Sequence, residues 1–153
     1  MASDISVHGC PFCDIAAGRL PSSQLYADDL VLAFMDTRPV NPGHLLVVPR
    51  SHAARLADLP EPAGAAMFTT AQRLAVALRA ASVRCDAVNF FLADGTAAGQ
   101  EVDHVHLHVL PRFADDGFKL SVRFLAPERA DLDATAASIR AACREPTGSA
   151  TPS

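Results

Sequence analysis

The chain has 153 residues, half of which are apolar, and a formal net charge of −4. This size and composition are typical of one soluble globular domain, and we expect it to span residues 1–145, followed by a disordered tail over residues 146–153. Because the chain has no excess of basic residues, it is not expected to bind nucleic acid. No apolar run approaches the roughly 20 residues of a membrane span, and no secretory signal is recognisable, which predicts a cytoplasmic protein without a membrane partner.

The first half of the chain predicts one short helix and three strands. In chain order we expect a helical turn over residues 14–17 and a hairpin whose two strands span residues 24–26 and 30–35. A loop rich in turn-forming residues follows over residues 38–43, and then a third strand over residues 44–48. Gly18 is a suitable residue to end the helical turn.

The second half predicts two helices and two further strands. We expect a long helix over residues 62–82, a strand over residues 87–92 and a loop of small residues over 94–100. A further strand over residues 104–110 and a C-terminal helix over 131–143 complete the chain. Asp131 is the expected N-cap of the last helix. Together these elements predict an α+β domain with a mostly antiparallel, five-stranded sheet.

Residues 104–110 carry three histidines at alternate positions, with an aliphatic residue in each gap. In a strand, successive side chains point to opposite faces, so the histidines would share one face and the aliphatic residues would face the core. The two sets are His104, His106 and His108, and Val105, Leu107 and Val109. Neutral imidazole is both a nucleophile and a metal ligand, so this face predicts catalysis or metal binding.

One metal ion does not account for all three histidines. Alternate residues of a strand are about 6.6–7 Å apart, so three of them span about 13 Å, too far for one ion to bind every ring. At least one ring must therefore have another role. Gly95 and Gly99, just upstream, let the backbone approach a ligand closely, and the N–H groups of their loop could hold a phosphate.

The four cysteines do not form an obvious disulfide framework. Cys85 and Cys143 resemble small apolar residues of helix ends or faces. Cys10 and Cys13 form a Cys-x-x-Cys pair, which is typical of metal binding but is also compatible with two free thiols.

Two segments resemble the histidine triad superfamily of nucleotidyl hydrolases and transferases. Residues 99–112, Gly-Gln-Glu-Val-Asp-His-Val-His-Leu-His-Val-Leu-Pro-Arg, are similar to its signature, and residues 36–50, Asp-Thr-Arg-Pro-Val-Asn-Pro-Gly-His-Leu-Leu-Val-Val-Pro-Arg, to its first half. Both blocks in this order are far more specific than an isolated histidine stripe. The resemblance covers residues 10–112 and implies the fold of that family and a homodimer joined through the long helix and a sheet edge.

The resemblance implies a hydrolase of purine nucleotide conjugates. His106 would attack the α-phosphorus, and water would then release a nucleoside monophosphate from the covalent nucleotidyl-histidine. His108 would stabilise charge on the phosphate oxygens, and His44 would lie beside these two rings. Gly99 and Gln100 would hold the phosphate.

The same resemblance implies how the nucleoside is bound. Asp36 would accept hydrogen bonds from the ribose hydroxyls, although an aspartate in this position could also cap its own loop. The apolar wall around the base would be formed by Pro11, Phe12, Ile15 and Phe34.

Members of the superfamily that have the Cys-x-x-Cys pair use it to bind a structural zinc ion. The matching ligands here are Cys10, Cys13, His52 and His104, a closed set of two sulfurs and two nitrogens. His8, close to Cys10, is an alternative fourth ligand.

Two substrate-binding positions depart from the phosphoramidase branch of the family. Ala93 stands where many relatives have Asn, a contact that Asn89 could replace, and Glu101 stands where they have a hydroxyl residue. A carboxylate at position 101 would repel a polyphosphate unless it is protonated or turned away. Arg112 could reach a second phosphate or lie solvated on the surface.

Three functions therefore remain open. Phosphoramidate-type hydrolysis is the main expectation, and hydrolysis of dinucleoside polyphosphates is an alternative that residues 110–112 favour weakly. A nucleotide sensor with low turnover is the third, supported by Ala93 and Glu101.

Overall fold

The computed structural model describes residues 9–143, in two units that divide between Phe118 and Lys119. The first unit contains the sheet, and the described part of the second, residues 119–143, contains one helix, α3 (Arg129–Ala142). The expected tail over residues 146–153 and the alternative ligand His8 lie outside the described residues. One domain extending to residue 145 stays a prediction.

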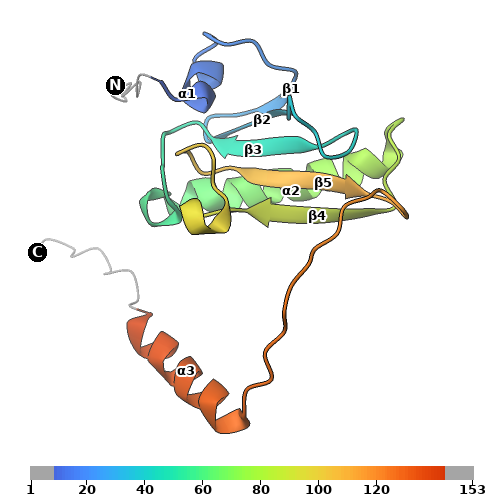
Figure 1. Ribbon diagram of the computed structural model, residues 1–153. Helices are drawn as coiled ribbons and strands as arrows, with labels where there is room; N and C mark the ends of the chain where they lie inside the picture. The colour runs from blue at the N-terminus through green and yellow to red at the C-terminus, as the bar shows by residue number, and fades with distance from the viewer. Residues whose placement is uncertain (1–8, 144–153) are drawn as a thin grey trace, which may run out of the picture. The chain divides into compact units, whose positions relative to one another are not determined.

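The first unit is built on the predicted five-stranded sheet (Figure 1). Its strands are β1 (Gln24–Ala27), β2 (Val31–Met35), β3 (Leu45–Pro49), β4 (Ala87–Leu92) and β5 (Leu107–Arg112). They lie in the order β1-β2-β3-β5-β4, and every neighbouring pair is antiparallel. The predicted α+β class is confirmed.

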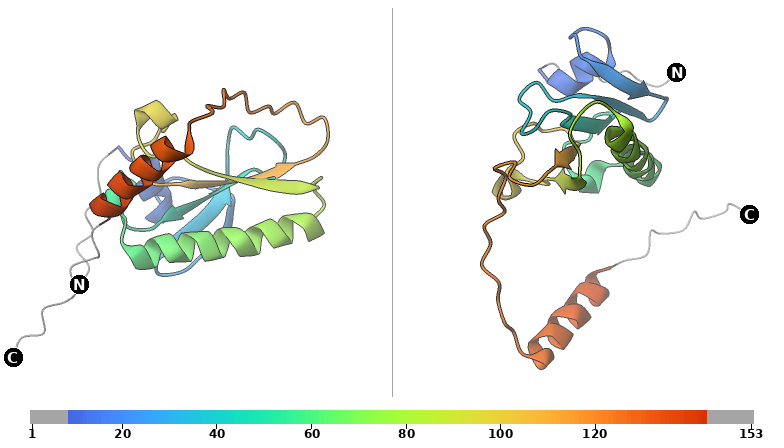
Figure 2. Two further views of the ribbon diagram at one scale, coloured as in Figure 1. Left: turned by 90° about the horizontal axis from the view of Figure 1, so that it is seen from below. Right: turned by 90° about the vertical axis from the view of Figure 1, so that its right-hand side faces the viewer.

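Both faces of the central strands are covered. The long helix α2 (Glu61–Ala80) runs along one face (Figure 2, left), where Met67 and Ala71 pack against Val47 and Val109. Phe12, from the short helix α1 (Pro11–Ala16), belongs to a second cluster on the other side of β2 and β3. Its further members are Cys10, Cys13, Leu32, Phe34, Leu46 and Val48. Burial on both faces explains why β2 and β3 are continuously apolar rather than alternating.

The histidine strand begins later than predicted. The expected start at His104 is wrong, because β5 begins at Leu107 and its pairing with β3 ends at the Val47–Leu107 pair. The N–H of Val105 instead donates to the carbonyl of Ala53 at 2.7 Å, outside the ladder. The facing is nevertheless as predicted, since Val105, Leu107 and Val109 all belong to the core cluster under α2.

The helix boundaries also differ from the sequence prediction, and α2 spans Glu61–Ala80 rather than residues 62–82. Helix α1 begins at Pro11 rather than at residue 14, because a proline needs no hydrogen-bond acceptor in the first helical turn. Helix α3 follows Glu128, so Asp131 lies in its first turn and is not the N-cap. Two short 3-10 turns, Leu56–Asp58 and Thr96–Ala98, complete the described elements. Within residues 9–143, no helix is both long enough and apolar enough to cross a membrane.

Candidate active site and metal site

A cavity of about 580 Å³ opens where four parts of the chain meet: α1, β2, the loop after β2, and residues 104–110, called the histidine segment below. Nearly all the side chains expected to contact substrate line it. These are Pro11, Phe12, Ile15, Phe34, Asp36, His44, Glu101, His106 and His108, with the backbone of Gly99. The rings of Phe12 and Phe34 lie 5.6 Å apart and form one apolar wall.

His106 is buried and held in one tautomer. Its Nδ1 lies 2.7 Å from the carbonyl oxygen of His104, and a carbonyl only accepts, so Nδ1 carries the proton. The Nε2 lone pair has no partner among the described residues, on a ring that lines the cavity. The ring of His108 is 4.9 Å away. In this tautomer Nε2 is the nitrogen of His106 that can act as a nucleophile.

His44 and His108 form a chain with a defined direction. The N–H of Val40 donates to His44 Nδ1 at 3.1 Å, so His44 carries its proton on Nε2. That Nε2–H donates to His108 Nδ1 at 2.9 Å, and His108 therefore has its own proton on Nε2. Burial lowers the pKa of His108 to about 4, helped by the nearby rings of His106 and His44. Burial also lowers the pKa of His44, against the opposing effect of Asp36. Both rings are accordingly neutral near pH 7.

The same hydrogen bonds argue against a metal ion at this position. One ligand atom from each of Asp36, His44 and His108 lies within 4.8 Å of the others. A cation there would need the lone pair of His44 Nε2, which moves the proton to Nδ1. That proton would then face the N–H of Val40. The group is better explained as a hydrogen-bonded chain.

Asp36 has one oxygen for each of its two expected roles. Oδ1 accepts a hydrogen bond from the N–H of Arg38 at 2.7 Å, which is the loop cap. Oδ2 lies 3.6 Å from His44 Nε2, on a side chain that lines the cavity. Capping and ligand binding are therefore compatible.

Glu101 forms an ion pair that the sequence did not reveal. Its carboxylate lies 2.6 Å from Arg38 Nη2, and both side chains are largely exposed at the cavity. The pair neutralises the carboxylate that would otherwise repel an anionic substrate. Arg38 is the first residue of the loop over residues 38–43 and lies 63 positions before Glu101. No sequence pattern therefore predicts that the two side chains meet.

Gln100 lies behind the cavity wall rather than in it. Its Oε1 accepts from the N–H of Gly95 at 2.7 Å, and its Nε2 donates to the carbonyls of Ala54 and Val102, both at 2.9 Å. The amide is thus used to shape the loop. Of the two residues expected to hold phosphate, only Gly99 lines the cavity.

The four expected metal ligands meet between α1 and the start of the histidine segment. One ligand atom from each of Cys10, Cys13, His52 and His104 lies within 4.8 Å of the others. His104 Nδ1 is 3.3 Å from the sulfur of Cys10 and 3.5 Å from that of Cys13. These separations match those between neighbouring ligands of a tetrahedral ion with bonds of about 2.0–2.3 Å.

The protonation of these ligands also fits a metal. His104 Nε2 donates to the carbonyl of Pro49 at 2.9 Å, which leaves the Nδ1 lone pair facing the two sulfurs. Burial lowers the pKa of His104 to about 4. Burial raises the pKa of the Cys13 thiol to about 12, so a cation is needed to hold it as thiolate. The residues present fit a closed zinc site.

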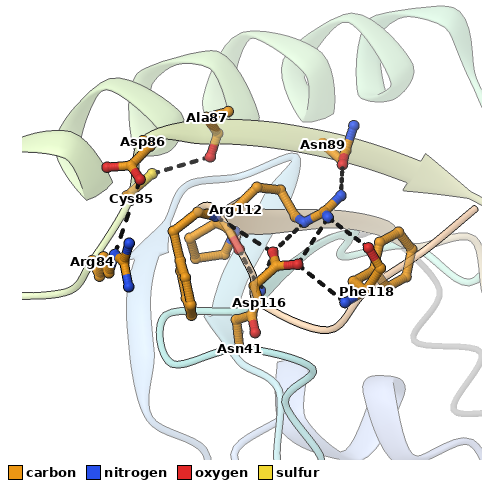
Figure 3. A network of polar contacts seen from close by, with 11 residues as sticks. Asn41, Arg84, Cys85, Asp86, Ala87, Asn89, Arg112, Asp116 and Phe118 are labelled. Carbon is orange, nitrogen blue, oxygen red and sulfur yellow. Dashed lines mark hydrogen bonds and ion pairs between the residues drawn. The ribbon is translucent and has the colours of Figure 1, made fainter.

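Arg112 differs from both sequence expectations, since it neither lines the cavity nor lies free on the surface. Its guanidinium donates to both oxygens of Asp116, to Asn89 Oδ1 and to the carbonyl of Phe118 (Figure 3). Asn89 is therefore engaged here, and the structure gives no sign that it replaces the contact missing at Ala93. Asn41 joins the network from a loop 75 positions before Asp116, a separation that no sequence signal bridges.

Comparisons with known proteins agree with this geometry. The model of the HIT domain matches residues 17–115. An uncharacterized HIT-like protein of Mycobacterium tuberculosis is 41% identical over 133 residues, 87% of this chain and 92% of the relative. An adenosine 5′-monophosphoramidase of Saccharomyces cerevisiae and an adenylylsulfatase of Arabidopsis thaliana are each 37% identical over 103 residues. These 103 residues are 67% of this chain but only 62% and 52% of the two enzymes.

Solved structures show the same fold. A HIT family member from Bacillus subtilis superposes with a TM-score of 0.84 and 32% identity, covering 90% of this chain and 99% of the other. A zinc-bound histidine triad protein from Mycobacterium smegmatis superposes with a TM-score of 0.69 and 39% identity, covering 88% and 97%. The chain belongs to the HIT, or histidine triad, family.

Proposed function

We propose that this protein hydrolyses purine nucleotide conjugates at the α-phosphorus through a covalent nucleotidyl-histidine on His106. The observation that carries the proposal is the tautomer of His106. Its Nδ1–H is bonded to a backbone carbonyl, so the Nε2 lone pair is available on a ring of the cavity. The family and two relatives, named an adenylylsulfatase and an adenosine 5′-monophosphoramidase, support the reaction class.

The first step forms a bond between His106 Nε2 and phosphorus, while the bond from phosphorus to the leaving amine breaks. The amine takes a proton from water in the open cavity. The Nδ1–H of His106 remains hydrogen-bonded to the carbonyl of His104, and this acceptor stabilises the positive charge that develops on the ring. Water then attacks phosphorus and gives its proton to the hydroxide left when the amine was protonated. The nitrogen–phosphorus bond breaks, and the nucleoside monophosphate leaves with the Nε2 lone pair of His106 restored.

His108, oriented by His44, donates a hydrogen bond to the phosphate during both steps. Because His44 Nε2–H is given to His108 Nδ1, His108 presents its own Nε2–H outward. A fixed donor of this kind stabilises charge that grows on the phosphate oxygens in the transition state. Asp36 Oδ2 and the wall of Phe12 and Phe34 are the proposed contacts of ribose and base.

We propose zinc as a structural ion bound by the Cys10, Cys13, His52 and His104 set. Bound there, zinc would fix α1, which supplies Phe12 and Ile15 to the cavity wall. All four protein ligands are used, so the ion supplies stability rather than an open coordination position. The homodimer and the purine preference also stay predictions.

The polyphosphate alternative was favoured weakly by residues 110–112, and the one charged residue among them is used elsewhere. Arg112 is engaged with Asp116 and Asn89 and does not line the cavity. Glu101 beside the phosphate site is paired with Arg38 and so does not exclude an anionic leaving group by itself.

The function is tested by incubating the protein with adenosine 5′-phosphoramidate and, separately, with diadenosine tetraphosphate, and measuring AMP. We expect AMP from the phosphoramidate, and a protein mass increased by one adenylyl group after a rapid acid-free quench. His106→Ala should lose both signals, whereas Arg84→Ala, which lies outside the cavity, should keep them. Equal AMP release by His106→Ala and the parent protein would refute the enzyme. Faster cleavage of the tetraphosphate would favour the alternative, and tight AMP binding without turnover would favour a sensor.

A further inference from the structure

The sheet holds the backbone of His44 on one side only. Its carbonyl accepts a hydrogen bond from the N–H of Asp36 at 3.0 Å, just beyond the β2–β3 pairing, whereas the ladder between β3 and β5 starts at the Leu45–Val109 pair, one residue after His44. The loop that precedes His44 fixes its ring. The N–H of Val40 holds the ring through Nδ1, and the N–H of His44 itself donates to the carbonyl of Asn41 at 3.0 Å. The place of the His44 ring opposite His108 therefore depends on how this loop is held.

The side chain of Asn41 ties the loop to the strand that carries His108. It is 4% exposed, and its Nδ2 donates to the carbonyl of Pro111 at 2.9 Å and to Asp116 Oδ2 at 3.0 Å. Pro111 is three residues after His108 on β5. One amide group thus connects the loop of His44 with the strand of His108.

Asp116 is a fixed acceptor for this amide (Figure 3). Its side chain is 3% exposed and accepts two hydrogen bonds from Arg112 and one from the N–H of Phe118 at 3.0 Å. The guanidinium of Arg112 also lies over the ring of Phe118, 4.4 Å from its centroid, and donates to Asn89 on β4. The carboxylate cannot move without disturbing several bonds at once, so it anchors Asn41.

We propose that Asn41, anchored by Asp116, is a positioning residue for the histidine pair: it keeps His44 Nε2–H directed at His108 Nδ1. The inference rests on the proposed function for its catalytic consequence. If the loop loosened, His108 would be free to adopt the other tautomer and would present a lone pair to the phosphate oxygens. The wall proposed for the base lies on α1 and β2, and Asp36, the proposed ribose contact, directly follows β2. We therefore expect the loss to fall on turnover more than on binding.

The test compares two Asn41 variants with a matched control. Asn41→Ala removes the amide, and Asn41→Asp keeps its size while replacing the N–H donors by acceptors. Asn89→Ala is the control, because it removes an asparagine from the same network without touching the loop of His44. Ring nitrogens are followed by long-range proton–nitrogen NMR on histidine-labelled protein near pH 8, and kcat and KM are measured with adenosine 5′-phosphoramidate.

In the parent protein and in Asn89→Ala we expect His44 and His108 as single Nε2–H tautomers. In both Asn41 variants we expect mixed tautomers, a kcat lower by roughly tenfold or more and a KM within about twofold of the parent. Folding of each variant is checked by its melting curve, and one folded Asn41 variant is sufficient for the comparison.

Either of two results would overturn the positioning role. One is unchanged tautomers of His44 and His108 in a folded Asn41 variant, whatever its rate. The other is an equal change in Asn89→Ala, which would mean that the network acts only through general stability. Absence of turnover in the parent protein would instead refute the proposed function, and the NMR comparison would still decide the role of Asn41.

Discussion

Replacing Gly43 by alanine tests the loop that holds His44. Gly43 has a φ of +93°, and a Cβ there would lie 3.1 Å from Pro111 Cγ, 3.2 Å from Leu78 Cδ2 and 3.3 Å from Val83 Cγ2. Alanine would therefore meet both an unfavourable backbone conformation and a packed wall formed by β5 and the end of α2. Gly18 is a matched control, because it has a φ of +72° and no atom within 4 Å of the added Cβ.

The two substitutions separate the two effects. A left-handed backbone costs an L-residue roughly 1–2 kcal/mol, and an extra group in a packed site costs roughly 1–3 kcal/mol. Both variants also gain a few tenths to about 1 kcal/mol from the stiffer unfolded chain. We expect Gly18→Ala to lose about 1 kcal/mol and Gly43→Ala about 3 kcal/mol of unfolding free energy. At roughly 2–4 °C per kcal/mol, Gly43→Ala should melt about 6–12 °C below the parent protein.

The assay is urea unfolding followed by circular dichroism, with the two variants and the parent at equal protein and zinc concentrations. Equal slopes against urea would show that the variants unfold from comparably compact states. If Gly43→Ala is no less stable than Gly18→Ala, the wall around Gly43 is not packed as described, and the argument that the loop positions His44 fails with it.

Three further predictions concern the metal, the acid range and the two kinds of ion pair. Purified protein should contain about one zinc ion per chain, and Cys10→Ser or His104→Gln should lower both that ratio and the melting temperature; metal-free protein with freely alkylated thiols would contradict the site. An NMR titration should place the pKa of His108 near 4, below its ordinary 6.5. Its neutral form then stabilises the fold fully above about pH 6.5, and this stabilisation is lost as the pH falls toward about 4; a midpoint at or above 6.5 would contradict the burial argument. Asp116→Asn should destabilise the protein more than Glu101→Gln in urea, because Asp116 is 3% exposed and Glu101 is 71% exposed; the reverse order would show that the buried pair is not formed.

The sequence predicted the parts of the site that depend on periodicity and on local composition. Alternation placed Val105 and Val109 in the core, and the tight Cys-x-x-Cys spacing indicated that the sulfurs of Cys10 and Cys13 lie close enough to bind one ion, which their positions allow. The start of β5 was missed because the N–H of Val105 is bonded to Ala53, a choice made by tertiary structure rather than by residue type.

Residues that meet only in the folded chain were not predictable in this way. Asn41 and Asp116 are separated by 75 positions, and neither belongs to a repeating pattern. Gln100 shows a different limit: an amide suits a phosphate contact and a loop brace equally well, and only the positions of Gly95 and Ala54 show that it braces the loop. Residue type restricts the chemistry of a side chain, while its hydrogen-bond partners decide which chemistry is used.

Of the three histidines in residues 104–110, only one has a tautomer that substitution of another side chain can change. The ring of His104 is oriented by the carbonyl of Pro49, and that of His106 by the carbonyl of His104. Both acceptors are backbone atoms, so replacing neighbouring side chains leaves these tautomers in place. His108 alone is oriented by a side chain, His44, whose own proton is placed by a loop N–H. Among the three histidines of residues 104–110, the tautomer of His108 is therefore the one that a distant side chain can change, and Asn41 is the residue proposed to do so.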